Sequence, residues 1–215
     1  MIRRTIALLL PVTLAGCANL LGELGGGTTV TGVVKAPETQ QAAIAFTDAY
    51  RTAGTIAGER AVSEAEVRAY GADGNAIGGM VKASKSGLFE LKGLPSGKAV
   101  ILVATAKSKS GGTLRITAFT KPAGTSSVRD LNTASTIVAE KLKATLSAAK
   151  LDALTQNDVD TLEGRVSNTL DTADIPDLTS ATAALEAFDK VERKNASIAN
   201  AFASISEGRA IASVR

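Results

Sequence analysis

Eleven residues in the middle of the chain carry the clearest signal of its architecture: Gly87-Leu88-Phe89-Glu90-Leu91-Lys92-Gly93-Leu94-Pro95-Ser96-Gly97. Within them, Phe89 and Leu91 alternate with Glu90 and Lys92, which is the period-two pattern of a strand with one buried face. Glycines at both ends, together with Pro95, indicate turns on either side. The sequence therefore predicts a short, half-buried strand between two reversals of the chain.

Similar short strands are expected on both sides of this segment. We predict strands at residues 30–36, 65–70, 77–82, 99–106 and 113–120, an edge strand at 127–131, and a loop at 58–63. Asp73-Gly74 favours a hairpin turn between two of them. The strand at 99–106 is almost wholly apolar, so it should lie centrally with both faces covered. Short strands separated by turn residues in this way are typical of a β-sandwich.

The same residues resemble a known family. The segment 87–97 fits the G-x-F-x-L-x-G-L-P-x-G core of carboxypeptidase regulatory-like domains, which are small sandwiches of the transthyretin (prealbumin) type. Gly32-Val33-Val34 and residues 65–70, followed by Asp73-Gly74, are similar to the upstream part of that pattern. The resemblance covers residues 29–106, interrupted by an insertion at 37–63. It implies an antiparallel sandwich of the kind that serves as an accessory or adhesive domain.

From residue 132 the apolar pattern changes to a helical period. We predict about three helices: one capped by Asn132 or Thr133, one beginning near Thr155, and one along the stripe from Leu185 to Ile205. Asn195 interrupts that last stripe, either as a polar contact in the seam or as a break between two helices. A short helix at 42–53 is also plausible. The expected fold is α+β: a small antiparallel β-sandwich at 29–131, followed by a C-terminal α-helical segment at 132–215.

The N-terminal residues indicate export and lipid attachment. Arg3 and Arg4 precede a short apolar run at 6–14, which is too short for a permanent membrane helix of about 20 residues. The run ends in Leu14-Ala15-Gly16-Cys17, which resembles the lipobox of bacterial lipoproteins. The resemblance implies a signal peptide at 1–16, a lipid on Cys17, and a flexible lipidated tether at 17–28. Ala18 stands where aspartate would retain such a protein in the inner membrane, so we expect the outer membrane.

Composition restricts the chemistry open to the chain. Histidine is absent and Cys17 is the single cysteine, which removes the commonest general base and the usual zinc ligands. Loss of residues 1–16 would remove Arg3 and Arg4 and lower the net charge from +3 to +1. A nearly neutral chain with 3 % aromatic residues does not fit a nucleic-acid binder. We therefore expect no catalytic residue, no cofactor and no metal site.

The expected function is that of a lipid-anchored cell-envelope protein acting as a non-catalytic binding or structural module. Its partners would be the membrane, through the lipid anchor, and an envelope protein or polysaccharide. One alternative is an accessory, carbohydrate-binding or adhesion lipoprotein at the cell surface, which would need exposed aromatic side chains. A second is a histidine-independent hydrolase, which would need a nucleophile paired with a lysine or carboxylate base.

Several polar patterns could carry chemistry but have simpler interpretations. Ser147 and Lys150 fit the S-x-x-K spacing of penicillin-interacting serine enzymes without the other motifs of that class. The acidic residues near the start of the second helix are explained by the helix dipole, and those at 171–177 by a solvated loop. Lys35 and Asn132 resemble the Lys–Asn isopeptide pair of collagen-adhesin B-type domains, with Glu90 as the only nearby acid, although a first-strand lysine is usually solvated. The acidic residues are Asp152, Asp158, Asp160, Glu163, Asp171, Asp174 and Asp177.

Overall fold

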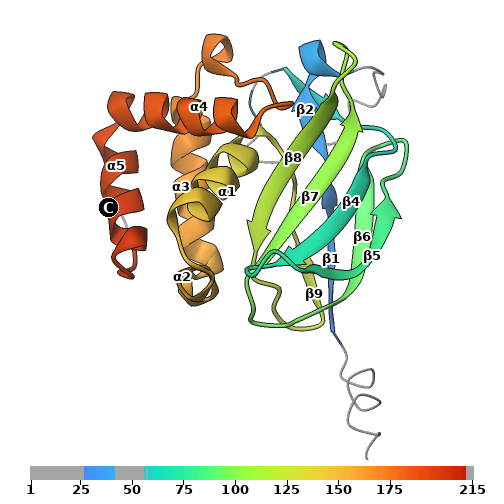
Figure 1. Ribbon diagram of the computed structural model, residues 1–215, viewed down its shortest axis with the longest axis horizontal. Helices are drawn as coiled ribbons and strands as arrows, with labels where there is room; N and C mark the ends of the chain where they lie inside the picture. Colours follow the sequence, from blue (N-terminus) through green and yellow to red (C-terminus); the bar gives the residue numbers. More distant parts are fainter. Residues whose placement is uncertain (1–26, 42–55, 57, 212–215) are drawn as a thin grey trace, which may run out of the picture.

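The computed structural model describes residues 27–41, 56 and 58–211. β-Sheets form one side of the molecule and α-helices the other (Figure 1). The expected α+β class, with sandwich-like antiparallel sheets followed by helices, is confirmed. Cys17 and the expected helix at 42–53 lie outside the described residues.

The strands form two main sheets and one small pair. The four-stranded sheet is antiparallel throughout, in the order β5-β4-β7-β8. The three-stranded sheet has the order β6-β1-β9, and a two-stranded sheet joins β2 to β3. The bounds are β1 Thr28–Val33, β2 Lys35–Pro37, β3 Glu59–Ala61, β4 Glu66–Gly71, β5 Ala76–Lys82, β6 Leu88–Leu94, β7 Val100–Lys107, β8 Thr113–Thr120 and β9 Ser126–Val128.

Three details differ from the strand predictions. The expected first strand is divided into β1 and β2, with Val34 between them. The predicted loop at 58–63 is wrong, because β3 lies there and pairs antiparallel with β2. The edge strand β9 forms as expected, but it runs parallel to β1, which places the first and last described strands side by side (Figure 1). All three depend on partners far away along the chain, which a local pattern does not contain.

Strand β7 separates two hydrophobic cores. Ile101 and Val103 face the cluster formed with the helices, whereas Leu102 and Ala104 face the interior between the sheets. Because successive side chains of a strand point to opposite faces, an unbroken apolar run is what a strand between two cores needs. The prediction that this strand is central and covered on both faces is confirmed.

The helices follow the strands and pack on the outer face of the four-stranded sheet (Figure 1). Ser147 caps a separate short helix, α2, that follows α1. Asn195 is a break rather than a seam contact: it ends α4 and caps α5. Within the described residues, no helix combines the length and apolar character needed to cross a membrane. The bounds are α1 Thr133–Thr145, α2 Ala148–Ala153, α3 Gln156–Thr169, α4 Ala181–Lys194 and α5 Ala196–Ser206, with 3-10 turns η1 Glu38–Gln40 and η2 Thr172–Asp174.

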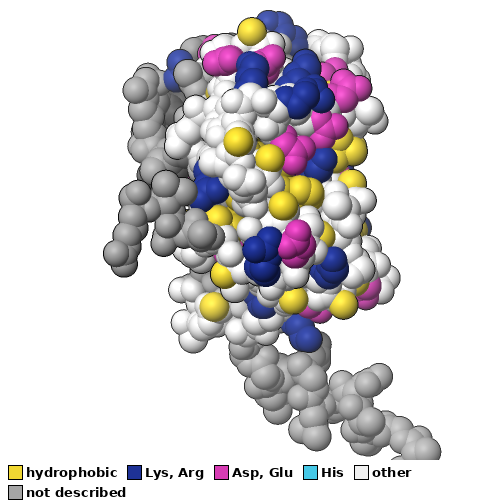
Figure 2. Space-filling view, turned by 90° about the vertical axis from the view of Figure 1, so that its left-hand side faces the viewer, with side chains coloured by type: hydrophobic (Ala, Val, Ile, Leu, Met, Phe, Trp, Pro, Cys, Tyr) yellow, Lys and Arg dark blue, Asp and Glu magenta, His cyan; other side chains and the backbone are white. Residues whose placement is uncertain are grey.

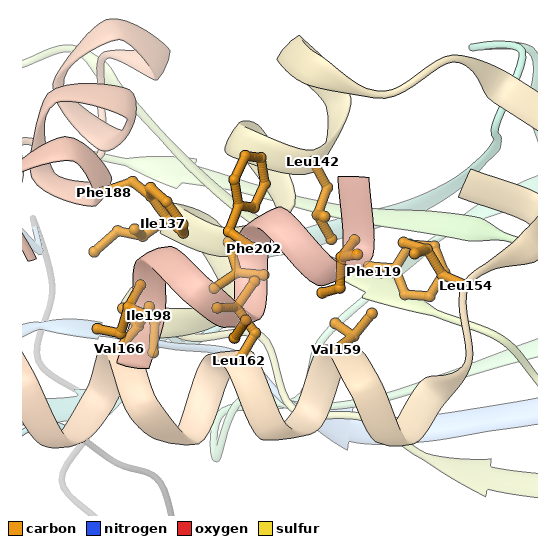
Figure 3. Close-up of a cluster of buried hydrophobic side chains, with 14 of the residues drawn as sticks. Phe119, Ile137, Leu142, Leu154, Val159, Leu162, Val166, Phe188, Ile198 and Phe202 are labelled. Carbon is orange, nitrogen blue, oxygen red and sulfur yellow. The ribbon is translucent and has the colours of Figure 1, made fainter. Parts of the chain in front are cut away.

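The helical core is built around buried aromatic side chains (Figure 3). Phe119, from β8, is fully buried and packs in the same hydrophobic cluster as the helices. Phe188 of α4 and Phe202 of α5 meet edge to face, with ring centroids 5.2 Å apart. Such pairs contribute about 1 kcal/mol beyond the area they bury. One continuous apolar cluster therefore joins the sheet to all five α-helices, α1 to α5.

Asn132 begins α1 with a capping box. Its side chain accepts a hydrogen bond from the Ser135 N–H at 2.8 Å, and the Ser135 hydroxyl accepts from the Asn132 N–H at 2.9 Å. We expect Asn132→Ala to lower the free energy of unfolding by about 1 kcal/mol, because the Ser135 N–H loses its side-chain acceptor. Urea unfolding followed by circular dichroism measures this. Asn132→Asp retains an acceptor oxygen and should stay close to wild type; equal losses in both variants would contradict the capping role.

Candidate functional site

A buried lysine pairs with a partly buried carboxylate where β1 continues into β2. Lys35 is 3 % exposed, and its Nζ lies 3.0 Å from Oδ2 of Asp130. The other carboxylate oxygen, Oδ1, accepts a hydrogen bond from the Val33 N–H at 2.9 Å. Both oxygens of Asp130 are thus held by groups from the first two strands.

The backbone fixes the two partners relative to each other. The Lys35 N–H donates to the Leu131 carbonyl at 2.7 Å, and the Leu131 N–H donates to the Val33 carbonyl at 3.0 Å. Val34 and Leu131 form a parallel bridge between these bonds. The sheet therefore fixes the backbones of Lys35 and Asp130 relative to each other. Only rotation within the two side chains can change the distance between their charged groups.

Glu59 on β3 is the acid that accompanies this pair. It stands opposite Pro37 in the β2–β3 ladder, so its side chain is on the same face as Lys35. Its carboxylate accepts from the Thr133 N–H at 2.7 Å and from the Ile56 N–H at 3.2 Å. Burial raises the pKa of Glu59 above its usual value of 4.5, opposed by these hydrogen bonds and by the positive charge of Lys35. We call Lys35, Asp130 and Glu59 the junction cluster.

The sequence identified one member of the junction cluster. Lys35 is buried rather than solvated, and its partner is Asp130 instead of Asn132, which caps α1. Glu90 is exposed and pairs with Lys92 on its own strand. The favoured interpretation of Lys35 as a solvated lysine is therefore wrong, and the structure does not bring Lys35, Asn132 and Glu90 together. Asp130 lay within the predicted edge strand at 127–131 and Glu59 in a predicted loop, so neither was recognised as a partner of Lys35.

A cleft opens between the β4–β5 hairpin and the first two helices. Its volume is about 440 Å³. The floor is apolar, and two cations lie among the lining side chains: Arg115 of β8 and Lys143 of α1. Both reach the buried Glu140, at 3.8 Å and 2.8 Å respectively. Asp73 also lines the cleft, so with Glu140 two carboxylates stand against the two cations. The apolar lining comprises Tyr70, Ala72, Ile101, Val103, Leu146 and Leu151.

A second ionic cluster ties Arg129, the residue after β9, to α3. Arg129 donates to Asp160 at 2.9 Å and also contacts Glu163. Burial raises the pKa of Glu163 from 4.5 to about 7, against the lowering effect of Arg129. Two of the acidic residues for which the helix dipole seemed a sufficient explanation therefore bind a specific arginine. Neutral Glu163 remains an acceptor for the guanidinium, so the contact does not require its charge.

The pKa of Glu163 predicts a pH-dependent stability. A carboxyl group whose folded pKa exceeds its unfolded pKa stabilises the fold below pH 4.5 and loses that contribution as pH rises through about 7. We expect the free energy of unfolding of the wild type to fall by about 2 kcal/mol more than that of Glu163→Gln between pH 5 and pH 8. Urea unfolding at both pH values gives this difference. Parallel pH profiles would contradict the assignment.

The remaining acidic and nucleophilic candidates are occupied by structural contacts. Lys194 binds Asp171 and Asp174, and Asp152 accepts from the Ala99 N–H at 2.8 Å. The amine of Lys150 donates to the Ser206 carbonyl at 2.6 Å, whereas the Ser147 hydroxyl caps α2.

Surface charge is mixed on the helical side of the molecule. The helical side of the molecule carries basic and acidic side chains interspersed, without a field of one sign (Figure 2). Among residues 27–41, 56 and 58–211, no three histidine, cysteine, aspartate or glutamate side chains are grouped so as to hold a metal ion.

Comparison with models of known protein families, and with curated proteins, gives no match to this chain.

Proposed function

We propose that the chain is a lipid-anchored protein of the cell envelope, attached through Cys17 to the outer membrane, and that its sandwich and helices act as a non-catalytic binding module. The proposed localisation rests on Arg3, Arg4, the apolar run at 6–14 and the lipobox. Lipid chains on one cysteine would anchor the protein without a transmembrane helix. The resemblance of residues 29–106 to carboxypeptidase regulatory-like domains supports an accessory role.

The observation that carries the binding function is the cleft beside α1. Ligand sites are usually concave and mostly apolar, with a few polar groups that orient the ligand. The cleft has this composition: Arg115, Lys143 and Asp73 are the charged groups of its lining, so we expect a largely apolar ligand with polar groups that pair with them. A platform of stacked aromatic rings for a sugar is less well supported, because Tyr70 is the single aromatic residue in the lining. The hydrolase alternative is less well supported, because the Lys150 amine donates to the Ser206 carbonyl oxygen and is not paired with the Ser147 hydroxyl as a base.

The anchor is tested by metabolic labelling with a fatty acid and by membrane fractionation. The wild type should incorporate the label and sediment with outer membranes, whereas Cys17→Ser should remain unlabelled and soluble. Protease digestion of intact and of permeabilised cells then shows whether the folded part of the protein faces the cell exterior or the periplasm. Cleavage on intact cells would favour adhesion or an external ligand, and protection would favour a partner in the periplasm. A labelled Cys17→Ser protein would contradict the assignment of the lipid site.

The cleft is tested with anilinonaphthalene sulfonate, an apolar dye with one negative charge, by titration calorimetry on soluble Cys17→Ser protein. Ala72→Trp should fill the cleft and weaken binding by about tenfold or more. Ala76→Trp is the matched control, because Ala76 is exposed on β5 outside the lining, and it should bind as the parent does. Lys143→Gln should weaken binding and reduce its salt dependence. If Ala72→Trp and Ala76→Trp bound the dye with equal affinity, the cleft would not be the binding site.

A further inference from the structure

We propose that the cleft faces the bilayer to which Cys17 is anchored and takes up an acyl chain of a phospholipid from that bilayer. The inference rests on the proposed function, both its lipid anchor and its binding cleft, and it names the class of ligand. Two observations carry it: the end of the fold at which the cleft lies, and the shape and chemistry of the lining.

The register of the strands places the cleft at the end of the sandwich where β1 begins. Thr28, at the start of β1, pairs with Leu94 at the end of β6. Residues 95–99 then lead into β7, whose first residue, Val100, pairs with Gly71 at the end of β4. Gly71 is part of the cleft lining. The start of β1 and the β4–β5 turn therefore lie at the same end of the molecule (Figure 1).

Helix α2, which forms the other border of the cleft, is held at this end too. Asp152 of α2 accepts a hydrogen bond from the Ala99 N–H at 2.8 Å. The Lys121 amine donates to the carbonyls of Asp152 and Leu154 at 2.7 Å and 3.0 Å. Leu151, also on α2, lines the cleft. The two borders of the cleft thus belong to the end at which the chain enters the fold.

The length of chain before β1 keeps this end close to the lipid anchor. Thr28 follows Cys17 by eleven residues, and a chain of that length spans at most about 40 Å when fully extended. A fold of this size is itself about 40 Å across. The opposite end, with the β7–β8 turn at 108–112, could reach the bilayer only if that segment ran fully extended along the whole molecule. The end that carries the cleft is therefore the one that faces the bilayer.

The cleft is elongated along β7. Ile101 and Val103 lie on the same face of this strand and line the cleft. Arg115, also in the lining, stands opposite Thr105, the next residue on that face. Since a strand rises about 3.3 Å per residue, the lining extends about 13 Å along β7 from Ile101 to the level of Arg115. This shape suits a linear chain better than a compact ligand.

The chemistry of the lining also fits a lipid. Its apolar part is aliphatic apart from Tyr70 and offers a hydrocarbon chain a surface away from water. Its charged side chains, Asp73, Arg115 and Lys143, are available to the polar headgroup. An acyl chain that passes from the bilayer into an adjoining apolar cleft exchanges one apolar environment for another. Proximity to the bilayer therefore removes the cost of carrying the chain through water.

Lipid uptake by the soluble Cys17→Ser protein tests the proposal. The protein is incubated with vesicles of palmitoyl-oleoyl phosphatidylethanolamine and phosphatidylglycerol and separated from them by flotation, and its bound lipid is extracted and measured by mass spectrometry. Phospholipid should be recovered in about equimolar amount. Ala72→Trp should retain at least about tenfold less. Ala76→Trp is the matched control outside the lining and should retain as much as the parent. Circular dichroism checks that both variants fold.

The dye titration separates failure of this inference from failure of the proposed function. If the parent protein bound the dye in the cleft but retained no phospholipid, the binding module would stand and the acyl-chain ligand would be overturned. Equal amounts of lipid in Ala72→Trp and Ala76→Trp would place the lipid outside the cleft and overturn it as well.

The source of the chain is tested with the lipidated wild type in vesicles that contain a phospholipid with a photoactivatable acyl chain. Irradiation should cross-link this lipid to peptides that contain residues 70–74 or 143–151, and Ala72→Trp should abolish the cross-links. Cross-linking of the cleft in Cys17→Ser but not in the lipidated protein would assign the cleft to the protein's own lipid. That result would overturn the bilayer as the source.

Hydrogen exchange tests the orientation. Amides at 71–75 and 146–151 should exchange more slowly in the lipidated protein on vesicles than in soluble Cys17→Ser, whereas those at 108–112, at the opposite end, should be unchanged. Slower exchange at 108–112 alone would place the opposite end against the bilayer and contradict the proposal.

Discussion

Replacing Gly32 by alanine is expected to lower the free energy of unfolding by about 3 kcal/mol or more. A Cβ at this position would lie 1.9 Å from the Arg129 carbonyl oxygen and 2.6 Å from its carbon. Both are backbone atoms of the segment that runs beside β1, so no side-chain rotation relieves the overlap. The Arg129 N–H also donates to Thr31 at 2.7 Å, and separation of the strands would break that bond.

Chemical denaturation followed by circular dichroism measures the loss. Gly79→Ala is the matched control, because Gly79 also lies in a strand and nothing stands within 4 Å of the place that its methyl group would take. The control should change stability by less than about 0.5 kcal/mol. If the Gly32 variant lost no more than the Gly79 variant, the close approach of β1 to residue 129 would be contradicted.

Phe119→Ala is expected to cost about 3 to 5 kcal/mol. Phe119 is fully buried on β8 and belongs to the cluster that joins the sheet to the helices. Removing the ring leaves a cavity whose walls come from different elements, and a rigid sheet on one side cannot close it. The loss should fall on the attachment of the helices, so amide hydrogen exchange in α1 should accelerate as well.

The control for this variant is Val128→Ala on β9, where the side chain is 82 % exposed. It should stay within about 0.5 kcal/mol of the wild type in the same urea titration. A loss below about 1 kcal/mol for Phe119→Ala would mean that the helices are held to the sheet by other contacts. The two titrations together distinguish core packing from a general sensitivity of the β-strands.

The local parts of the fold could be predicted from the sequence. Alternation and apolar runs between turn residues identified β4 to β8, and helical spacing with Asn132 and Thr155 as caps identified α1 and α3. Strand β3 was missed because three residues are too few to show a period. The parallel β1–β9 pairing was missed because hydrogen bonding between segments about a hundred residues apart leaves no mark on either segment.

The junction cluster was only partly predictable for a related reason. A lysine on the first strand was singled out, but burial of its amine depends on Asp130 and Glu59, which come from two other segments. The contact of Arg129 with Glu163 was likewise hidden, because an acid in an early helical turn already has a local explanation. Charges that are explained locally give no reason to look for a distant partner.

The position of β1 between β6 and β9 also sets an order of events as the chain folds. One edge of β1 can be paired once residue 94 has been made, but the other edge has no strand to bind until residue 128 follows. Proteins whose contacts join distant residues fold slowly, because a long loop must close before those contacts form. During that interval β1 presents an open edge, so the sheet is completed only when nearly all of its sequence is present, and the helices that begin at Thr133 come later still.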